Sequence, residues 1–427
     1  MAAPGTQSLT VLVVGSGGRE HALALAISKD PAVGSVHVAP GNPGTARIAA
    51  NHPLDIMDGD AVAALAIALH ADLVVIGPEA PLVAGIADSV RAAGIACFGP
   101  SQAAAQLEGR KAFAKAVMAD AGVPTARARV CTDAAAASAA LDEFGAPYVV
   151  KADGLAAGKG VVVTANREAA LDHARECEQV VIEEYLDGPE LSLFVITDGE
   201  SAVPLPAAQD FKRVGENDEG PNTGGMGSYA PLPWLPAGTV ETVMAQVVRP
   251  TLARMRELGT PFAGLLYVGL SLTGVGPRVV EFNARFGDPE TEVVLPLLDG
   301  PFAQVLLAAA IGQLAQAPRL ALRPGACVGV VLASQGYPAA PHPGGTIMLA
   351  PEPAQVHVVH AGTALDAHGQ LVSAGGRVLC VVAHGDDLEQ ARERAYAHID
   401  EIDFATGFCR RDIAAPARLA AIAARLG

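Results

Sequence analysis

A segment near the middle of the chain places two lysines beside a glycine-rich turn. It reads VVKADGLAAGKGVVV, with Lys151 at the end of one run of valines and Lys159 shortly before the next. Lysine ammonium groups and the backbone amides of a glycine loop can together hold phosphate. A P-loop is excluded, because three residues instead of four separate Gly154 from Gly158, no hydroxyl follows Lys159, and a strand pattern follows in place of a helix. We interpret the segment as a hairpin that covers the phosphates of a nucleotide; a surface hairpin with solvated lysines is the alternative.

A carboxylate, an amide and a guanidinium alternate along RVVEFNARFG. Because successive side chains of a strand point to opposite faces, Glu281, Asn283 and Arg285 should share one face. A carboxylate and an amide oxygen two residues apart suit magnesium, which takes few protein oxygens and completes its shell with phosphate and water. The alternative is a structural ion pair between Glu281 and Arg285.

Two further segments carry groups that could bind small polar molecules. In VVIEEYLDGPELS, the backbone of Glu183–Leu186 could meet the edge of an adenine, and Glu190 could meet ribose hydroxyls. The segment DFKRVGENDEGPNTGGMG contains Asp210 and Lys212 followed by several glycines, which could together bind a small anionic substrate. A flexible linker is the alternative for this second segment.

The elements that position these groups begin with an alternation of apolar runs and helix-like segments from Leu9 to Pro124, which predicts a doubly wound parallel sheet. Ligands of such sheets bind beyond the carboxyl ends of the strands, here Gly15–His21, Pro40–Asn42, Gly77–Glu79 and Gly99–Ser101. The loop VGSGGREH could hold a phosphate at a helix N-terminus, or could be a tight turn without a ligand. A dinucleotide-binding fingerprint would need glycine where Glu20 stands, so a nicotinamide-dependent oxidoreductase is disfavoured.

Beyond Pro124 the pattern predicts antiparallel sheets. A small α+β module should include a helix near Arg167–Glu178, and a second set of strands should include LSLFVITDG and the hairpin ending at RVVEFN. The long loop Gln209–Trp234 is typical of a lid or of disorder. After Gly325 the chain is strand-rich, with predicted strands that include GGTIMLA and one clear helix over Asp386–Ile399.

Composition limits the classes of function. Half of the residues (51%) are hydrophobic, so several buried cores are feasible, and 29 basic against 45 acidic residues give a net charge of −16, which repels nucleic acid. The sequence shows neither a signal-type apolar segment nor a stretch long enough to cross a bilayer, so we expect a cytoplasmic protein without a membrane partner. The six cysteines are far apart and lack zinc-site spacing, which indicates buried thiols.

Read in order, these segments identify a family. The segments are VGSGGREHAL, APGNPGTA, GPEAPLVAGI, FGPSQAAAQLEGRKAFAK, VVKADGLAAGKGVVV, DFKRVG with GPNTGGMGSYAPLP, and VVEFNARFGDPET. The set resembles the phosphoribosylamine–glycine ligases of the ATP-grasp superfamily over nearly the whole chain. The resemblance implies that ATP, glycine and 5-phosphoribosylamine give glycinamide ribonucleotide, ADP and phosphate through glycyl phosphate, in purine biosynthesis and with Mg²⁺ or Mn²⁺.

The resemblance also implies a multidomain α/β and α+β fold of the ATP-grasp type. We expect a substrate-binding domain with a doubly wound parallel sheet at 1–104, an ATP-grasp core at 105–122 and 187–323, a small lid domain at 123–186, and a strand-rich carboxyl-terminal domain at 324–427. We further expect a monomer or a weak dimer, and a stand-alone ligase because the chain ends where fused relatives continue.

By match of motif, the resemblance implies roles for individual residues. Catalysis would involve Arg285 and Lys159, and the metal would be held by Glu281 and Asn283. The ATP-binding residues would be Lys111, Lys151, Lys159, Glu183, Glu184, Tyr185, Leu186 and Glu190. The substrate-binding residues would be Gly17, Gly18, Asn42, Glu79, Asp210, Lys212, Asn222, Thr223, Gly224 and Arg285.

One departure from the family pattern lies before VVIEE, where only ECEQ fills a segment that many members have longer and glycine-containing. This shortening bears on closure over ATP. Two rival interpretations remain besides the oxidoreductase: another ATP-grasp ligase acting on a different acid and amine, and a nucleotide sensor without catalysis. ATP hydrolysis that depends on glycine distinguishes them.

Overall fold

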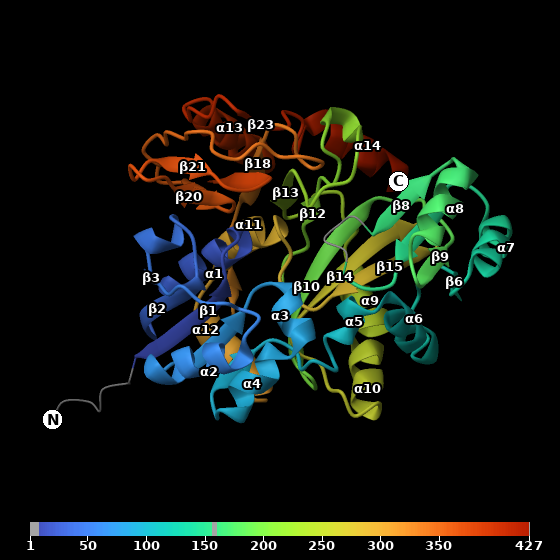
Figure 1. Cartoon of the computed structure of the whole chain (residues 1–427), viewed down its shortest axis with the longest axis horizontal. Helices are drawn as coiled ribbons and strands as arrows, with labels where there is room; N and C mark the ends of the chain where they lie inside the picture. Colours follow the sequence, from blue (N-terminus) through green and yellow to red (C-terminus); the bar gives the residue numbers. More distant parts are fainter. Residues whose placement is uncertain (1–7, 156–159, 427) are drawn as a thin grey trace.

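The amino-terminal part of the chain folds into a five-stranded parallel sheet with helices on both faces (Figure 1). The computed structural model describes residues 8–155 and 160–426. Alternate residues of the central strands enter two different cores, because Leu12 and Val14 pack with one set of helices and Val11 and Val13 with the other. The predicted doubly wound sheet is therefore confirmed. Its strands, in the order β3-β2-β1-β4-β5, are β1 (Leu9–Gly15), β2 (Val33–Pro40), β3 (Ala50–Asn51), β4 (Leu73–Ile76) and β5 (Ala96–Phe98).

The helix-like segment at 82–93, one of those in the predicted alternation, is divided between two helices. Gly85 lies there with φ 93°, a left-handed conformation that ends one helix and starts the next. Asp58 caps the preceding helix by accepting a hydrogen bond from the amide of Ala61. The helices of this part are α1 (Gly18–Ser28), η1 (Thr45–Arg47), α2 (Gly59–Ala68), α3 (Glu79–Ala84) and α4 (Ile86–Ala92).

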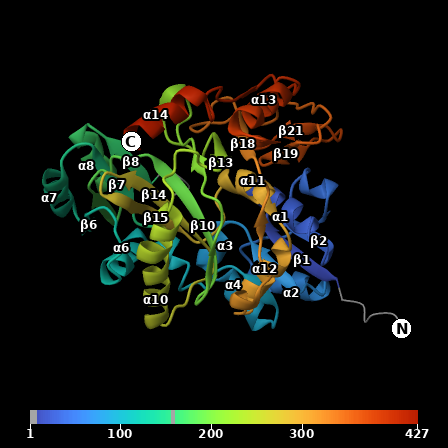
Figure 2. The same cartoon turned by 180° about the vertical axis from the view of Figure 1, so that it is seen from behind.

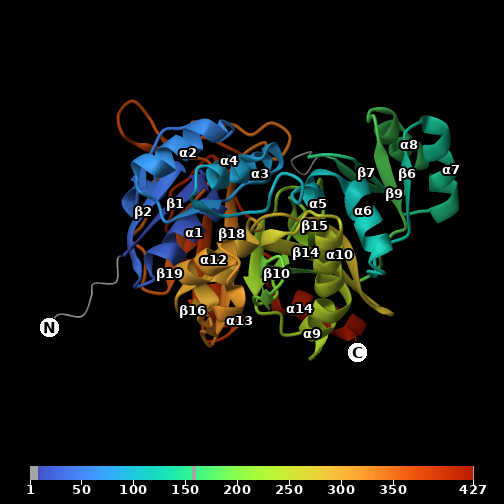
Figure 3. The ribbon, with the colours of Figure 1, turned by 90° about the horizontal axis from the view of Figure 1, so that it is seen from below.

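A small α+β module follows, joined to the first sheet by α5 (Gln106–Gly109) and α6 (Lys111–Asp120). Its antiparallel strands run in the order β6-β9-β7-β8, and their apolar face packs against two helices capped by Asp133 and Asn166. The module projects at one end of the molecule (Figure 3). Its elements are β6 (Ala128–Cys131), α7 (Ala134–Phe144), β7 (Tyr148–Ala152), β8 (Val161–Thr164), α8 (Arg167–Arg175) and β9 (Val180–Glu183).

A four-stranded antiparallel sheet forms the centre, in the order β11-β10-β14-β15. A long helix packs near it, seen from behind in Figure 2, and the sequence analysis missed this helix. The missed signal is the apolar spacing of Val243, Val247, Leu252 and Met255; Pro250, which lacks an amide hydrogen, lies just after a π-helical turn in this segment. The elements are β10 (Glu190–Asp198), β11 (Ala202–Pro204), α9 (Thr239–Val243), η3 (Met244–Val248), α10 (Arg249–Glu257), β14 (Ala263–Thr273) and β15 (Gly276–Asn283).

The loop predicted as a lid or as disorder at Gln209–Trp234 contains strands instead. β13 (Gly227–Ala230) is buried and pairs with a strand of the carboxyl-terminal sheet. The central part of the chain therefore contributes to the last sheet. This sheet runs β12-β13-β18-β22-β19, and β23 pairs with β18. Its strands are β12 (Gln209–Asp210), β13, β18 (Ala326–Ser334), β19 (Val356–His360), β22 (Arg377–Gly385) and β23 (Gly407–Phe408).

The carboxyl-terminal part differs from prediction in two places. The segment GGTIMLA forms only isolated bridges, at Thr346 and Met348, so the predicted strand is wrong. The predicted helix is present as α13 (Leu388–Ile399), but a second helix, α14 (Pro416–Leu426), was not predicted. The remaining elements are η2 (Glu216–Asp218), α11 (Glu290–Val294), η4 (Leu295–Leu297), β16 (Leu298–Asp299), α12 (Phe302–Ala310), η5 (Leu314–Gln316), β17 (Ala321–Leu322), β20 (Thr363–Leu365) and β21 (Leu371–Ser373).

Three features of the fold bear on the predictions. The helix α12 packs in the same core as α1 and β1, so part of the predicted 187–323 core covers the amino-terminal sheet. Within residues 8–155 and 160–426, no helix has the length and apolarity to cross a membrane. The cysteines are free; Cys177 and Cys409 are only partly buried, and the other four are buried as expected.

Candidate active site

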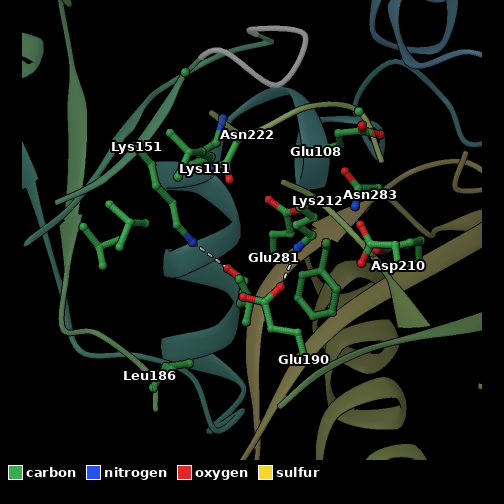
Figure 4. A pocket seen from close by; sticks show the side chains of 18 of the residues that line it. Glu108, Lys111, Lys151, Leu186, Glu190, Asp210, Lys212, Asn222, Glu281 and Asn283 are labelled. Atoms are coloured by element: carbon green, nitrogen blue, oxygen red, sulfur yellow. Dashed lines mark hydrogen bonds and ion pairs between the residues drawn. The ribbon is translucent and has the colours of Figure 1, made fainter. Parts of the chain in front are cut away.

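A cleft of about 800 Å³ opens where all four parts of the fold meet. Figure 4 shows side chains from the small module, the central sheet and β12 pointing into it. Of the predicted site residues, sixteen line the cleft: Glu79, Lys111, Lys151, Glu183, Glu184, Tyr185, Leu186, Glu190, Asp210, Lys212, Asn222, Thr223, Gly224, Glu281, Asn283 and Arg285. Lys159 falls outside the residues that the structure describes.

One buried carboxylate fixes two lysines at the floor of the cleft. Glu183 ends β9 and lies 2.9 Å from Nζ of Lys151 and 3.0 Å from Nζ of Lys115. Lys151 also donates to the carbonyl of Val280, at 2.8 Å. Burial lowers the pKa of Lys115, an effect that Glu183 opposes. The sequence analysis missed Lys115, although it follows Lys111 by one helical turn and therefore shares its face of α6.

Lys111 joins the glycine hairpin to the start of α6. Its Nζ donates to the carbonyl of Gly154 at 2.9 Å, and the amide of Ala112 donates to Oδ1 of Asp153 at 3.0 Å. Burial lowers the pKa of Lys111, while Glu281 acts in the opposite direction. The start of the hairpin is thus held beside a lysine that faces the cleft.

The segment after β9 offers backbone groups. The Glu184 carboxylate is already paired, 2.7 Å from Nε of Arg127 and 2.9 Å from Nη1 of Arg278. In contrast, no hydrogen bond among the described residues uses the backbone of Tyr185 or Leu186, which line the cleft. These backbone groups are therefore free to bind a ligand, whereas the Glu184 side chain stabilises the fold; recognition of adenine here stays a prediction.

The predicted alternative of an ion pair between Glu281 and Arg285 is wrong. Arg285 pairs instead with Glu79, 3.2 Å from Nε, and Glu108, 3.3 Å from Nη2. These partners come from α3 and α5, so the guanidinium is fixed by the amino-terminal half of the chain. Since the cation is neutralised twice, it keeps one orientation at the edge of the cleft.

Glu281 and Asn283 remain uncommitted. Within the described part of the chain, neither side chain has a hydrogen-bond or ion-pair partner, and both line the cleft. Burial raises the pKa of Glu281, but Lys212, Lys151 and Lys111 outweigh this effect and hold it below the usual value. An ionised carboxylate beside an amide oxygen is a donor set that fits a hard divalent cation.

Asp210 and Lys212 also line the cleft. Lys212 lies 2.5 Å from Oε2 of Glu190, the residue predicted to bind ribose. Burial raises the pKa of Asp210 to about 7; Lys212 opposes the shift, and Glu290 and Glu190 add to it. Asp210 can therefore gain or lose a proton near neutral pH.

The predicted residues Gly17, Gly18 and Asn42 do not line the cleft. The amide of Gly17 donates to Oε2 of Glu20 at 2.6 Å, and Asn42 is occupied with backbone groups, including the carbonyl of His360 at 2.9 Å. The glycine loop is thus closed by its own helix. A substrate role for these three residues stays a prediction.

The carboxyl-terminal part contributes side chains that the sequence analysis did not single out. Tyr337, Arg377 and Arg418 line the cleft, together with Ile422 and Arg425 of α14. The nearest sequence signal was the segment GGRVL, which contains Arg377 but showed no chemical pattern by itself.

The chain is similar to known proteins over most of its length. The chain matches the family models of phosphoribosylglycinamide synthetase: the N domain at residues 9–108, the ATP-grasp (A) domain at 109–291 and the C domain at 327–416. The phosphoribosylamine–glycine ligase of Streptomyces coelicolor is 57% identical over 414 residues, covering 96% of this chain and 99% of that one. That of Mycobacterium leprae is 54% identical over 415 residues, covering 95% and 97%.

Solved structures agree. The phosphoribosylamine–glycine ligase of Thermotoga maritima has a TM-score of 0.83 and 36% identity, covering 95% of this chain and all of that one. The biotin carboxylase domain of Hydrogenobacter thermophilus 2-oxoglutarate carboxylase shares the fold, with a TM-score of 0.70 at 18% identity, covering 93% and 91%. The chain belongs to the phosphoribosylamine–glycine ligase family of ATP-grasp proteins.

Proposed function

We propose that this chain joins glycine to 5-phosphoribosylamine at the expense of ATP, giving glycinamide ribonucleotide, ADP and phosphate in purine biosynthesis. The observation that carries the proposal is one cleft that combines lysines, two uncommitted oxygen donors and backbone groups in a chain 57% identical to a ligase of that name. The chain is an ATP-dependent ligase that acts in the cytoplasm as a monomer or a weak dimer.

The nucleotide binds between the small module and the central sheet. The free backbone of Tyr185 and Leu186 supports recognition of adenine there. Lys111 and Lys151 face the phosphates, and a phosphate-binding role of Lys159, which lies outside the described residues, stays a prediction. Glu190 meets the ribose once it releases Lys212; the two side chains are 38% and 48% exposed, so water can solvate them when they separate.

Glu281 and Asn283 hold Mg²⁺ or Mn²⁺, for which their ionised carboxylate and amide oxygen are suited. When bound, this cation neutralises charge on the transferring phosphoryl group. Around it, Lys111 and Lys151 supply further positive charge, so the chain itself stabilises the phosphates without a nucleophilic side chain.

The reaction has two chemical steps. A carboxylate oxygen of glycine forms a bond to the γ-phosphorus while the bond to ADP breaks, which gives glycyl phosphate. The amine of phosphoribosylamine then attacks the carbonyl carbon, the carbon–nitrogen bond forms, and phosphate leaves. Arg285, held by Glu79 and Glu108, orients the reacting carboxylate. Asp210, with a pKa of about 7, accepts the proton that the amine loses.

The test is phosphate release from ATP and magnesium with freshly generated phosphoribosylamine, run with and without glycine. We expect release only when both substrates are present, with glycinamide ribonucleotide identified by mass. Release with a different acid or amine alone would leave the ATP-grasp assignment and remove the named substrates. ATP binding without turnover would favour a nucleotide sensor.

A further inference from the structure

A cation of the carboxyl-terminal sheet enters the cleft with half of its guanidinium unused. Arg377 begins β22, and its Nη1 donates to the carbonyl of Gly224 at 2.6 Å and the carbonyl of Asp288 at 2.8 Å. The same nitrogen lies 3.0 Å from Oδ1 of Asp288. Among the described residues, Nε and Nη2 have no acceptor. The protein thus binds Nη1, whereas Nε and Nη2 can donate hydrogen bonds to two oxygens of one anion.

A hydroxyl lies beside this guanidinium. Oη of Tyr337 accepts a hydrogen bond from the amide of Gly224 at 3.0 Å, so its own hydrogen is free to be donated. The ring fits against the backbone because residue 376 is glycine; a Cβ there would lie 2.3 Å from Cδ2 of Tyr337. Tyr337 and Arg377 therefore converge on one spot and both line the cleft.

The glycine loop of the first sheet is a poor place for a phosphate. Its Gly17 amide is bonded to Glu20, which is 2% exposed. A Cβ on Gly18 would lie 2.7 Å from Oε1 of Glu292, and one on Gly17 would lie 3.7 Å from Oδ2 of Asp288. The side chains of Glu20, Asp288 and Glu292 crowd the loop, which leaves little space there for a phosphate. An anionic substrate must find its cation elsewhere.

Several other cations of the cleft already have partners. Lys151 is paired with Glu183, Lys212 with Glu190, and Arg285 with Glu79 and Glu108. Glu281 and Asn283 mark the end where phosphoryl transfer occurs, and five residues further on Asp288 is bound by Arg377.

From this arrangement we infer that Arg377 and Tyr337 bind the phosphate group of 5-phosphoribosylamine. The inference rests on the proposed function. Glycine must place its carboxylate beside the γ-phosphate, near Glu281, whereas the phosphate of the second substrate is separated from its amine by the ribose. Arg377 lies beyond Asp288, whose remaining carboxylate oxygen is available to a ribose hydroxyl.

The experiment compares binding of glycinamide ribonucleotide with binding of the same molecule lacking phosphate, glycinamide riboside. In the wild type, removal of the phosphate should weaken binding about 10- to 100-fold, the range for charge-assisted hydrogen bonds. In Arg377→Met the two compounds should bind almost equally. Arg377→Lys keeps the positive charge but loses the paired N–H donors of the guanidinium, and should retain part of the preference for the phosphate. Tyr337→Phe should lower the preference by about 10-fold, because it removes one hydrogen bond to a charged group.

Steady-state kinetics separate the two anionic substrates and control for folding. Arg377→Met should raise KM for phosphoribosylamine. KM for glycine and KM for ATP should stay within about threefold of the wild-type values, because a lost hydrogen bond would change them by more than this. A rise in KM for glycine alone would assign the site to the glycine carboxylate and overturn the inference. Equal phosphate preference in the wild type and in both Arg377→Met and Tyr337→Phe would also overturn it. A wild type that forms no glycinamide ribonucleotide would instead refute the proposed function.

Discussion

The isosteric change Glu292→Gln should make the protein more stable, and the gain should grow with pH. Glu292 lies in α11 with 1% exposure, and neither carboxylate oxygen has a hydrogen-bond partner among the described residues. Burial raises the pKa of Glu292 well above its usual value, and the nearby carboxylate of Asp288 adds to the shift. Folding therefore keeps a proton on Glu292 that the unfolded chain releases above a pKa of about 4.3.

The sign follows from proton counts. Between the unfolded and the folded pKa, the folded state binds more protons, so the unfolding free energy falls as pH rises. The slope for one group is about 1.4 kcal/mol per pH unit. Glutamine has no such proton, so the variant should gain on the wild type by about 1.4 kcal/mol between pH 5.5 and 6.5, and should continue to gain until the folded pKa is reached.

Urea denaturation at a series of pH values measures this difference. Glu200→Gln is the matched control, because it makes the same change of side chain at an exposed bend. Parallel stability curves for Glu292→Gln and the wild type from pH 5.5 to 8.5 would show that Glu292 is ionised in the fold, and would refute the reasoning.

Three further substitutions test the cleft. Glu183→Gln removes the carboxylate that Lys115 and Lys151 share, and should lower the unfolding free energy by about 3–5 kcal/mol in urea titrations. Adding Lys115→Met should restore much of the lost stability. A single variant as stable as the wild type would contradict a structural role of Glu183. Asp210→Asn should abolish the loss of kcat below pH of about 7 expected for the wild type, because only the ionised carboxylate accepts a proton; an unchanged pH profile would exclude Asp210 as that acceptor. Glu281→Gln should raise the magnesium concentration for half-maximal activity about 10- to 100-fold, and an identical titration would remove Glu281 from the metal site.

The sequence predicted those parts of the fold whose pattern is local. The strands of the first sheet are runs of apolar residues bounded by glycines, and Glu281 and Asn283 share a face by simple alternation. The pairing of β13 with β18 could not be predicted in this way, because nothing near Gly227 in the sequence indicates a partner about a hundred residues away. The domain boundaries remain a prediction, since β12, β13 and α12 connect parts that the boundaries separate.

Site residues were predictable when their own motif showed the chemistry. Lys151 lies beside a glycine loop, which pointed to phosphate. Arg377 lies in an ordinary strand sequence, and its role appears only when the fold brings Gly224 and Asp288 to one side of it. Gly17 shows the opposite case: its loop is typical of phosphate sites, yet its amide already donates to Glu20, so its substrate role stays a prediction. Motifs indicate which groups are available, and the fold decides which of them are already used.

The chain has a net charge of −16, yet lysines line the cleft in which we propose that ATP binds. These lysines form two kinds of ion pair with carboxylates. Lys151 and Glu183 are buried, with side chains 5% and 4% exposed, so separating them would leave an uncompensated charge, and the pair stays fixed as ATP binds. Lys212 and Glu190 are 38% and 48% exposed, so separating them costs less than separating the buried pair. In the proposed reaction the buried pair therefore stays in place, and the partly exposed pair can separate so that Glu190 binds the ribose.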